Sequence, residues 1–215
     1  MNEIYHLNGY NEKTLLFFHH LTDQPIFFYL MKLSSAYIGN YLWAPVTLPI
    51  LMALSLYALR KQNKNSKSDL CIKMLKSFII MISSLLIMGI LVKLLKSYFE
   101  MPRPYCSVDG NSIREFVVHK TAKCFRSFPS GHTAYTAVIV ASIWPILGKS
   151  LKCGSVIILS MVCVSRLAMA MHYPTDVIAS LILSLITVFL VTKLVSNLIA
   201  GRKKQLVNIC DCLTK

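Results

Sequence analysis

Three short clusters of polar side chains lie where long apolar runs of this chain begin or end. Together they bring three fixed cations, two imidazoles and one carboxylate to the edges of apolar segments. A charge near a bilayer is costly and normally has a functional partner, so this combination predicts a binding site for a phosphate group. The clusters are Lys96, Arg103 and Pro104; Pro129, Ser130, Gly131 and His132; and Ser165, Arg166, His172 and Asp176.

The third cluster is the most specific of the three. Arg166 interrupts an apolar run, and Pro174 suits the first position of the next helix, which places Asp176 in its first turn. A turn there can bring His172 back over Asp176. The carboxylate would then fix the imidazole tautomer and leave the other ring nitrogen free to attack an electrophile. The alternative is a capping Asp beside an interfacial His.

The second cluster predicts a helix N-terminus that can hold an anion. Ser130 is a natural N-cap, Gly131 permits close approach of a ligand, and His132 lies in the first turn. In the first cluster, neighbouring prolines favour extended backbone at Arg103. Taken alone, the second cluster also fits a capped helix with an incidental His, and Lys96 and Arg103 also fit cations that reach lipid headgroups.

In residue type, spacing and order, the three clusters resemble the three signatures of the type-2 phosphatidic acid phosphatase (PAP2) superfamily. The quoted residues cover 96–176. The resemblance implies that His172 attacks phosphorus, that Asp176 orients His172, and that His132 protonates the leaving oxygen and then activates water. It implies no metal and no cofactor. The phosphate-binding residues it implies are Lys96, Arg103, Ser130, Gly131 and Arg166, with Pro104 and Ser165 in supporting roles.

The composition predicts an all-α integral membrane bundle. Of the 215 residues, 55% are hydrophobic and only 15% are charged, which is too apolar for an ordinary soluble domain. The net charge of +14 does not indicate nucleic-acid binding, because the basic residues lie mainly between apolar runs. Five transmembrane helices are predicted, at 42–59, 77–95, 131–147, 154–171 and 175–197.

The predicted organisation has three parts: an N-terminal amphipathic segment at 1–41, a catalytic membrane domain at 42–200 and a basic cytoplasmic tail at 201–215. Residues 14–41 predict one or two interfacial helices, and a sixth span is the alternative. Glu3 and Glu12 are acidic where a signal peptide would be basic, so no signal peptide is expected.

The basic segments 60–76 and 148–153 and the tail predict a common cytoplasmic side. The loop 96–130, which precedes the second cluster, then lies on the outer side. Cys106 and Cys124 share this loop and predict either a disulfide in an oxidising compartment or two free thiols. The resemblance to bacterial envelope members implies an inner-membrane protein whose active site faces the periplasm.

A site at the membrane surface suits a substrate with its tail in the bilayer and its phosphate in water. The resemblance implies undecaprenyl diphosphate first, with lipid A, phosphatidylglycerophosphate and phosphatidic acid as alternatives. A phosphotransferase, in which an acceptor other than water takes the phosphate, is a further alternative, as is a lipid-binding protein without catalysis. No residue identifies the lipid tail or a protein partner.

Overall fold

The computed structural model describes residues 9–35, 64–107 and 124–201, and this part of the chain contains helices and no strands. The elements in chain order are α2 (Tyr10–His20), η2 (Leu21–Asp23), α3 (Pro25–Leu33), α5 (Lys64–Phe99), α6 (Pro104–Ser107), α7 (Gly131–Ile143), η6 (Trp144–Ile146), α8 (Lys149–Ala168) and α9 (Pro174–Ala200). The all-α prediction is therefore confirmed for the described residues.

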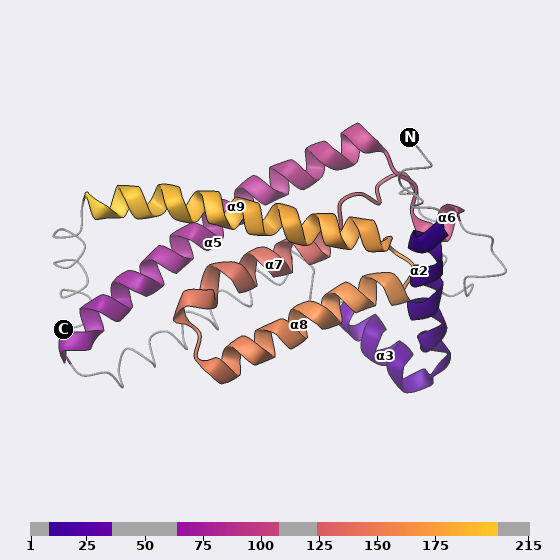
Figure 1. The fold of residues 1–215 in the computed structure, drawn as a ribbon, viewed down its shortest axis with the longest axis horizontal. Coiled ribbons are helices and arrows are strands. Elements are labelled where there is room, and N and C mark those ends of the chain that lie inside the picture. The colour runs from indigo at the N-terminus through magenta and orange to yellow at the C-terminus, as the bar shows by residue number, and fades with distance from the viewer. Residues whose placement is uncertain (1–8, 36–63, 108–123, 202–215) are drawn as a thin grey trace.

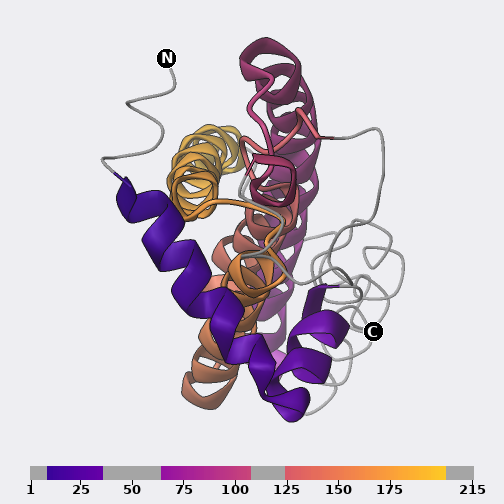
Figure 2. The same cartoon turned by 90° about the vertical axis from the view of Figure 1, so that its right-hand side faces the viewer.

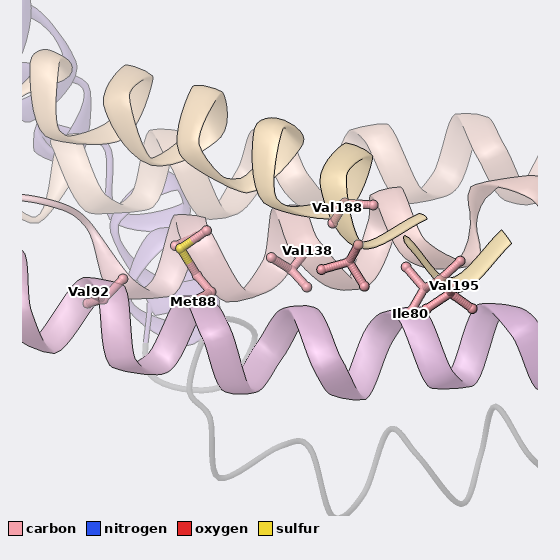
Figure 3. Packing of buried hydrophobic residues seen from close by; sticks show 8 residues of the cluster. Ile80, Met88, Val92, Val138, Val188 and Val195 are labelled. Carbon is pink, nitrogen blue, oxygen red and sulfur yellow. The ribbon is translucent and has the colours of Figure 1, made fainter. Parts of the chain in front are cut away.

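Helices α5, α7 and α9 pack side by side and form the main core, which Figure 3 shows from close by. The contact consists of aliphatic side chains that interlock between the three helices, with Met88 and Val138 completely buried. Dispersion contacts of this kind hold membrane helices together, because lipid removes the usual hydrophobic driving force between them. The buried residues are Ile80, Met88, Val92, Ala134, Val138, Val188, Val191 and Val195.

Three helical segments are long and apolar enough to cross a membrane: Asp69–Ser107, Lys149–Ala168 and Pro174–Ala200. Large aliphatic side chains such as Leu86 on α5 and Ile182 on α9 point outward and are more than half exposed. This arrangement suits a lipid environment, since a soluble protein rarely exposes so much contiguous apolar surface. The segments contain most of the spans predicted at 77–95, 154–171 and 175–197.

The other predicted spans are not confirmed. Helix α7 ends at Ile143 and continues only as the short turn η6, which contains Pro145. Its 13 residues reach about 20 Å, less than the ~30 Å of a bilayer core. The predicted span 42–59 lies outside the described residues, so the count of five or six spans stays a prediction. Helix α5 begins at Lys64, so much of the basic segment 60–76 is helical.

The N-terminal segment packs across the end of the bundle. Figure 2 shows α2 crossing in front of α8 and beside the start of α9, and α3 turns back beside it. Gln24 has extended backbone between them, so the described part of 14–41 is not one continuous helix. Leu15 and Met31 are buried against Ala168, Met169, Ala170 and Tyr173. This cluster attaches α2 and α3 to the connection between α8 and α9.

Replacement of Leu15 by Ala should lower the free energy of unfolding by about 2–5 kcal/mol, because Leu15 is completely buried and its loss leaves a cavity under α2. Thermal unfolding in detergent micelles measures the change. Phe17→Ala on the same helix is the matched control, since Phe17 is 61% exposed. Equal effects of the two substitutions would show that α2 is not packed on the bundle as described.

Candidate active site

One cavity of about 320 Å³ lies where α5 and α8 end and where α7 and α9 begin. These four helix ends lie on the right-hand side of Figure 1. Six of the predicted site residues line the cavity, and no carboxylate is among its described lining residues. The lining residues are Gly89, Val92, Lys93, Lys96, Arg103, Arg126, Gly131, His132, Tyr135, Arg166 and His172. The three sequence clusters therefore meet at a single, strongly positive site.

Backbone and side-chain contacts fix the three predicted cations. Lys96 Nζ donates to the carbonyl oxygen of Arg126 at 2.6 Å. The backbone N–H of Arg103 donates to the carbonyl oxygen of Cys124 at 2.7 Å, and the segment Glu100–Arg103 is not helical, as the prolines predicted.

Arg166 is only 4% exposed, and its Nη1 donates to the carbonyl oxygen of Ser35 at 3.3 Å and to the Ser35 hydroxyl. The Nε atoms of Arg103 and Arg166 are buried without a hydrogen-bond partner among the described residues. Because a buried N–H donor without a partner is costly, these two Nε atoms favour an anionic ligand.

The His172 and Asp176 side chains lie against each other as predicted. The distance from His172 Nδ1 to Asp176 Oδ2 is 3.6 Å, and both side chains are almost completely buried. This distance exceeds a normal hydrogen bond, so the contact is an electrostatic one in this structure. Oδ2 instead accepts hydrogen bonds from Ser127 Oγ at 2.6 Å and from the backbone N–H of Tyr173 at 2.9 Å. Catalytic hydrogen bonds often shorten only when substrate is bound.

Burial lowers the pKa of His172 below its usual value of 6.5, and nearby Arg166 and Lys96 act in the same direction. Asp176 opposes the shift. The burial effect is the largest because the charged imidazolium loses its hydration in the interior. His172 is therefore neutral at pH 7, which is the state required of a nucleophile.

Other predicted residues support the site without lining it. Ser130 precedes α7 as its N-cap, but its hydroxyl contacts Thr133 Oγ1 at 3.1 Å and makes no capping bond to the backbone. The Ser165 hydroxyl donates to the carbonyl oxygen of Val162 at 2.7 Å within α8. Pro104 is buried at the first position of α6. Roles for Ser130 and Ser165 at the phosphate remain proposals.

Cys106 and Cys124 form a disulfide in the structure, with their Cα atoms 5.8 Å apart. Of the two states left open by the sequence, this is the oxidised one. The bond joins α6 to the segment 124–127. Arg103 lies between the two partners, because its N–H donates to Cys124 and its carbonyl oxygen accepts from the N–H of Cys106. The disulfide therefore braces the backbone of Arg103, one of the predicted phosphate-binding residues.

Three positioning residues were missed by the sequence analysis. Ser127 holds Asp176, as described above. Asn11 on α2 makes two hydrogen bonds to Thr175. Its Nδ2 donates to the Thr175 hydroxyl at 2.8 Å, and its Oδ1 accepts from the Thr175 backbone N–H at 3.2 Å, so Asn11 caps the start of α9. His19 Nδ1 donates to the carbonyl oxygen of Ala168 at 2.8 Å, at the end of α8. No local pattern signals such contacts, which join residues 49, 164 and 149 positions apart.

Comparisons with known proteins agree with this geometry. The family model described as "PAP2 superfamily" matches residues 77–200, which is more than half of the chain. The fold is similar to the crystal structure of Aquifex aeolicus LpxE, with a TM-score of 0.61 and 18% sequence identity. That similarity covers 85% of this chain and 94% of the other. At this identity it shows a shared fold. No curated protein matches the chain in sequence.

Replacement of Ser127 by Ala should lower kcat by about tenfold to a hundredfold, because Asp176 loses a charge-assisted hydrogen bond that fixes its orientation. The change in KM should be smaller. Ser155→Ala is the matched control, since the Ser155 hydroxyl bonds to Lys152 near the opposite end of α8. Steady-state kinetics in micelles measure the effect, and a Ser127→Ala enzyme with full kcat would refute the role of Ser127.

The imidazole of His172 should stay neutral as the pH falls through 6.5 and should become protonated only at lower pH, because its pKa is lowered in the folded protein. The unfolded chain then binds more protons than the folded chain below pH 6.5, so this group makes folding less favourable in acid. Nitrogen NMR of labelled histidine, assigned with His172→Gln, measures the titration. A midpoint at or above pH 6.5 would contradict the described environment.

Proposed function

Because this chain belongs to the PAP2 superfamily, we propose that it is a membrane phosphatase that removes phosphate from a lipid phosphate or diphosphate through a phosphohistidine. The observation that carries the proposal is the cavity itself. It gathers His132, His172 and five cations, and no carboxylate is among its described lining residues. Phosphoryl transfer depends mainly on positioning and on stabilisation of negative charge, and such a cavity supplies both.

In the first half-reaction, the Nε2 atom of neutral His172 attacks phosphorus. Lys96, Arg103 and Arg166 hold the non-bridging oxygens, and the unpartnered Nε atoms of the two arginines are available donors. The bond between phosphorus and the lipid oxygen breaks. His132, which must take up a proton as the anionic phosphate binds among the cations, donates that proton to this oxygen. Asp176 lies beside Nδ1 and stabilises the positive charge that develops on the His172 ring.

In the second half-reaction, a water molecule replaces the lipid product. His132, now neutral, takes a proton from the water as the oxygen attacks phosphorus. The bond between phosphorus and Nε2 breaks, inorganic phosphate leaves, and His172 returns to its neutral state. Both histidines line the same cavity, which this exchange of roles requires.

The proposal includes independence from metal ions and from cofactors. The fixed cations of the cavity occupy the position in which a metal ion would otherwise neutralise the phosphate. A phosphotransferase uses the same first half-reaction and differs only in the acceptor. Phosphate release with water alone, compared with release in the presence of candidate acceptors, separates these two functions.

The proposed substrate is undecaprenyl diphosphate, and lipid A, phosphatidylglycerophosphate and phosphatidic acid are the alternatives. The proposed location is the bacterial inner membrane, with the cavity at the periplasmic surface. The support is the place of the cavity at the ends of membrane-capable helices, where a phosphate can stay in water while its lipid tail remains in the bilayer.

Replacement of His172 by Ala should lower phosphate release at least about a thousandfold, because the reaction loses its nucleophile. His132→Ala should lower it by about 10²–10⁴-fold through loss of acid and base catalysis. His20→Ala is the matched control, because His20 is largely exposed on α2. The assay measures phosphate release from the four candidate lipids in micelles that contain a metal chelator.

Full activity of a folded His172→Ala protein would refute the phosphohistidine route. Loss of wild-type activity in chelator, with recovery on addition of magnesium, would refute metal independence. Comparison of kcat/KM among the four lipids ranks the substrates.

A further inference from the structure

The cavity contains two cations that none of the three sequence clusters includes. Lys93 and Arg126 line it together with Lys96, Arg103 and Arg166. Neither has an ion-pair partner within the described residues, and both residues are exposed. A single phosphate carries a charge of at most about −2, which the three other cations already balance. Two further cations at the same cavity indicate a ligand with additional negative charge.

The order of residues along α5 shows where that charge would lie. Lys93 precedes Lys96 by three residues, so the two side chains share one face of the helix and are separated by about 4.5 Å along its axis. The direction from Lys96 to Lys93 leads away from the helix end and toward the apolar middle of α5. Further from this helix end, the cavity wall consists of Val92 and Gly89 of α5 and of Tyr135 of α7. The lining thus changes from cations to apolar surface in the direction in which a lipid tail must lie.

Arg126 lies next to Lys96. Its carbonyl oxygen accepts the 2.6 Å hydrogen bond from Lys96 Nζ, and this bond fixes the Arg126 backbone beside Lys96. The Arg126 side chain also lines the cavity. The backbone contact therefore brings a third guanidinium group to the cavity, from a segment outside α5.

We propose that Lys93 and Arg126 form a second anion subsite, which binds the phosphate on the lipid side of the scissile bond in a lipid diphosphate. This inference rests on the proposed phosphatase function and specifies its substrate class. The terminal phosphate occupies the site of Lys96, Arg103 and Arg166, facing His172. The adjoining phosphate, which shares one bridging oxygen with it, reaches Lys93 and Arg126, and its ester tail follows the apolar wall.

In this orientation the terminal phosphate is transferred to His172. His172 Nε2 forms a bond to the terminal phosphorus, the bond from that phosphorus to the bridging oxygen breaks, and His132 protonates the bridging oxygen. The leaving group is a lipid monophosphate. Lys93 and Arg126 are then next to the group on which negative charge develops, so they should stabilise the transition state as well as the bound substrate.

The spacing favours a diphosphate over a lipid whose two phosphates are separated by a linker. Adjacent phosphates in a diphosphate share an oxygen, so the second set of cations must lie directly beside the first. One helical turn between Lys93 and Lys96 meets this requirement. A lipid with one phosphate would leave Lys93 and Arg126 without an anion.

The test compares Lys93→Gln and Arg126→Gln with wild type on a polyprenyl diphosphate and a polyprenyl monophosphate of the same chain length. Each substitution should lower kcat/KM for the diphosphate about 10- to 100-fold, as expected for loss of a charge-assisted contact, and should lower it for the monophosphate much less. Lys193→Gln is the matched control, since Lys193 is exposed on α9 and does not line the cavity. It should leave both values unchanged.

Equal losses on the two substrates would overturn the subsite, because they would indicate a general electrostatic effect, and so would no loss on either. Phosphatidylglycerophosphate has two phosphates separated by a glycerol. A larger loss of kcat/KM on this lipid than on the diphosphate would assign Lys93 and Arg126 to the more distant phosphate and would contradict the proposal. Wild-type protein that hydrolyses neither polyprenyl substrate nor any other lipid phosphate would refute the proposed function, and the subsite with it.

A binding measurement that needs no turnover separates these failures. Inorganic diphosphate should bind to folded wild-type protein at least about tenfold more tightly than inorganic phosphate, as measured by thermal shift. Lys93→Gln and Arg126→Gln should remove that preference and retain phosphate binding. Equal affinity of wild type for the two anions would overturn the subsite even if the enzyme is an active phosphatase.

Discussion

The rest of the structure depends on one constraint: positive charge is concentrated in a cavity that no carboxylate lines among the described residues. Cations brought together at a membrane edge repel one another and lose hydration, so this arrangement is unfavourable unless an anion fills the cavity. The packed core of α5, α7 and α9 and the ends of four helices hold the cations in place despite their repulsion. The same constraint keeps His172 neutral, because burial and neighbouring cations both lower its pKa. One arrangement thus suits an anionic ligand and keeps the proposed nucleophile neutral.

Much of the support for the site comes from outside the three motifs. The segment 124–127 contacts Arg103, Lys96 and Asp176 in succession, through Cys124, Arg126 and Ser127. Helix α2 bonds to both ends of the connection between α8 and α9. His19 contacts the carbonyl oxygen of Ala168, and Asn11 contacts the backbone N–H of Thr175. The motifs therefore contain the proposed reacting groups, while less distinctive residues hold those groups in position. A loss of activity after substitution in these supporting segments would consequently arise from misplaced catalytic groups.

That the three clusters meet in one cavity could be predicted from the sequence, because each cluster has a characteristic local spacing. The pairing of His172 with Asp176 and the meeting of three distant clusters followed from motif spacing and helix topology. The contacts that hold these groups in position could not be predicted, because Ser127, Asn11 and His19 act through long-range hydrogen bonds without a local pattern. The length of α7 was overestimated, because apolar composition continued past Ile143 while Pro145 changed the backbone to a short 3₁₀ turn. Lys93 and Arg126 belong to none of the three clusters, and only the lining of the cavity shows that they lie beside Lys96.

The most direct measurement is identification of the covalent intermediate. Wild-type protein is mixed with a lipid phosphate substrate, quenched within milliseconds under alkaline conditions that preserve phosphohistidine, digested and analysed by mass spectrometry. We expect a phosphate on the peptide that contains His172, which forms on mixing and disappears as inorganic phosphate is released. Phosphate on a different residue, or turnover without any phosphorylated protein at any time, would contradict the assignment of His172 as the nucleophile.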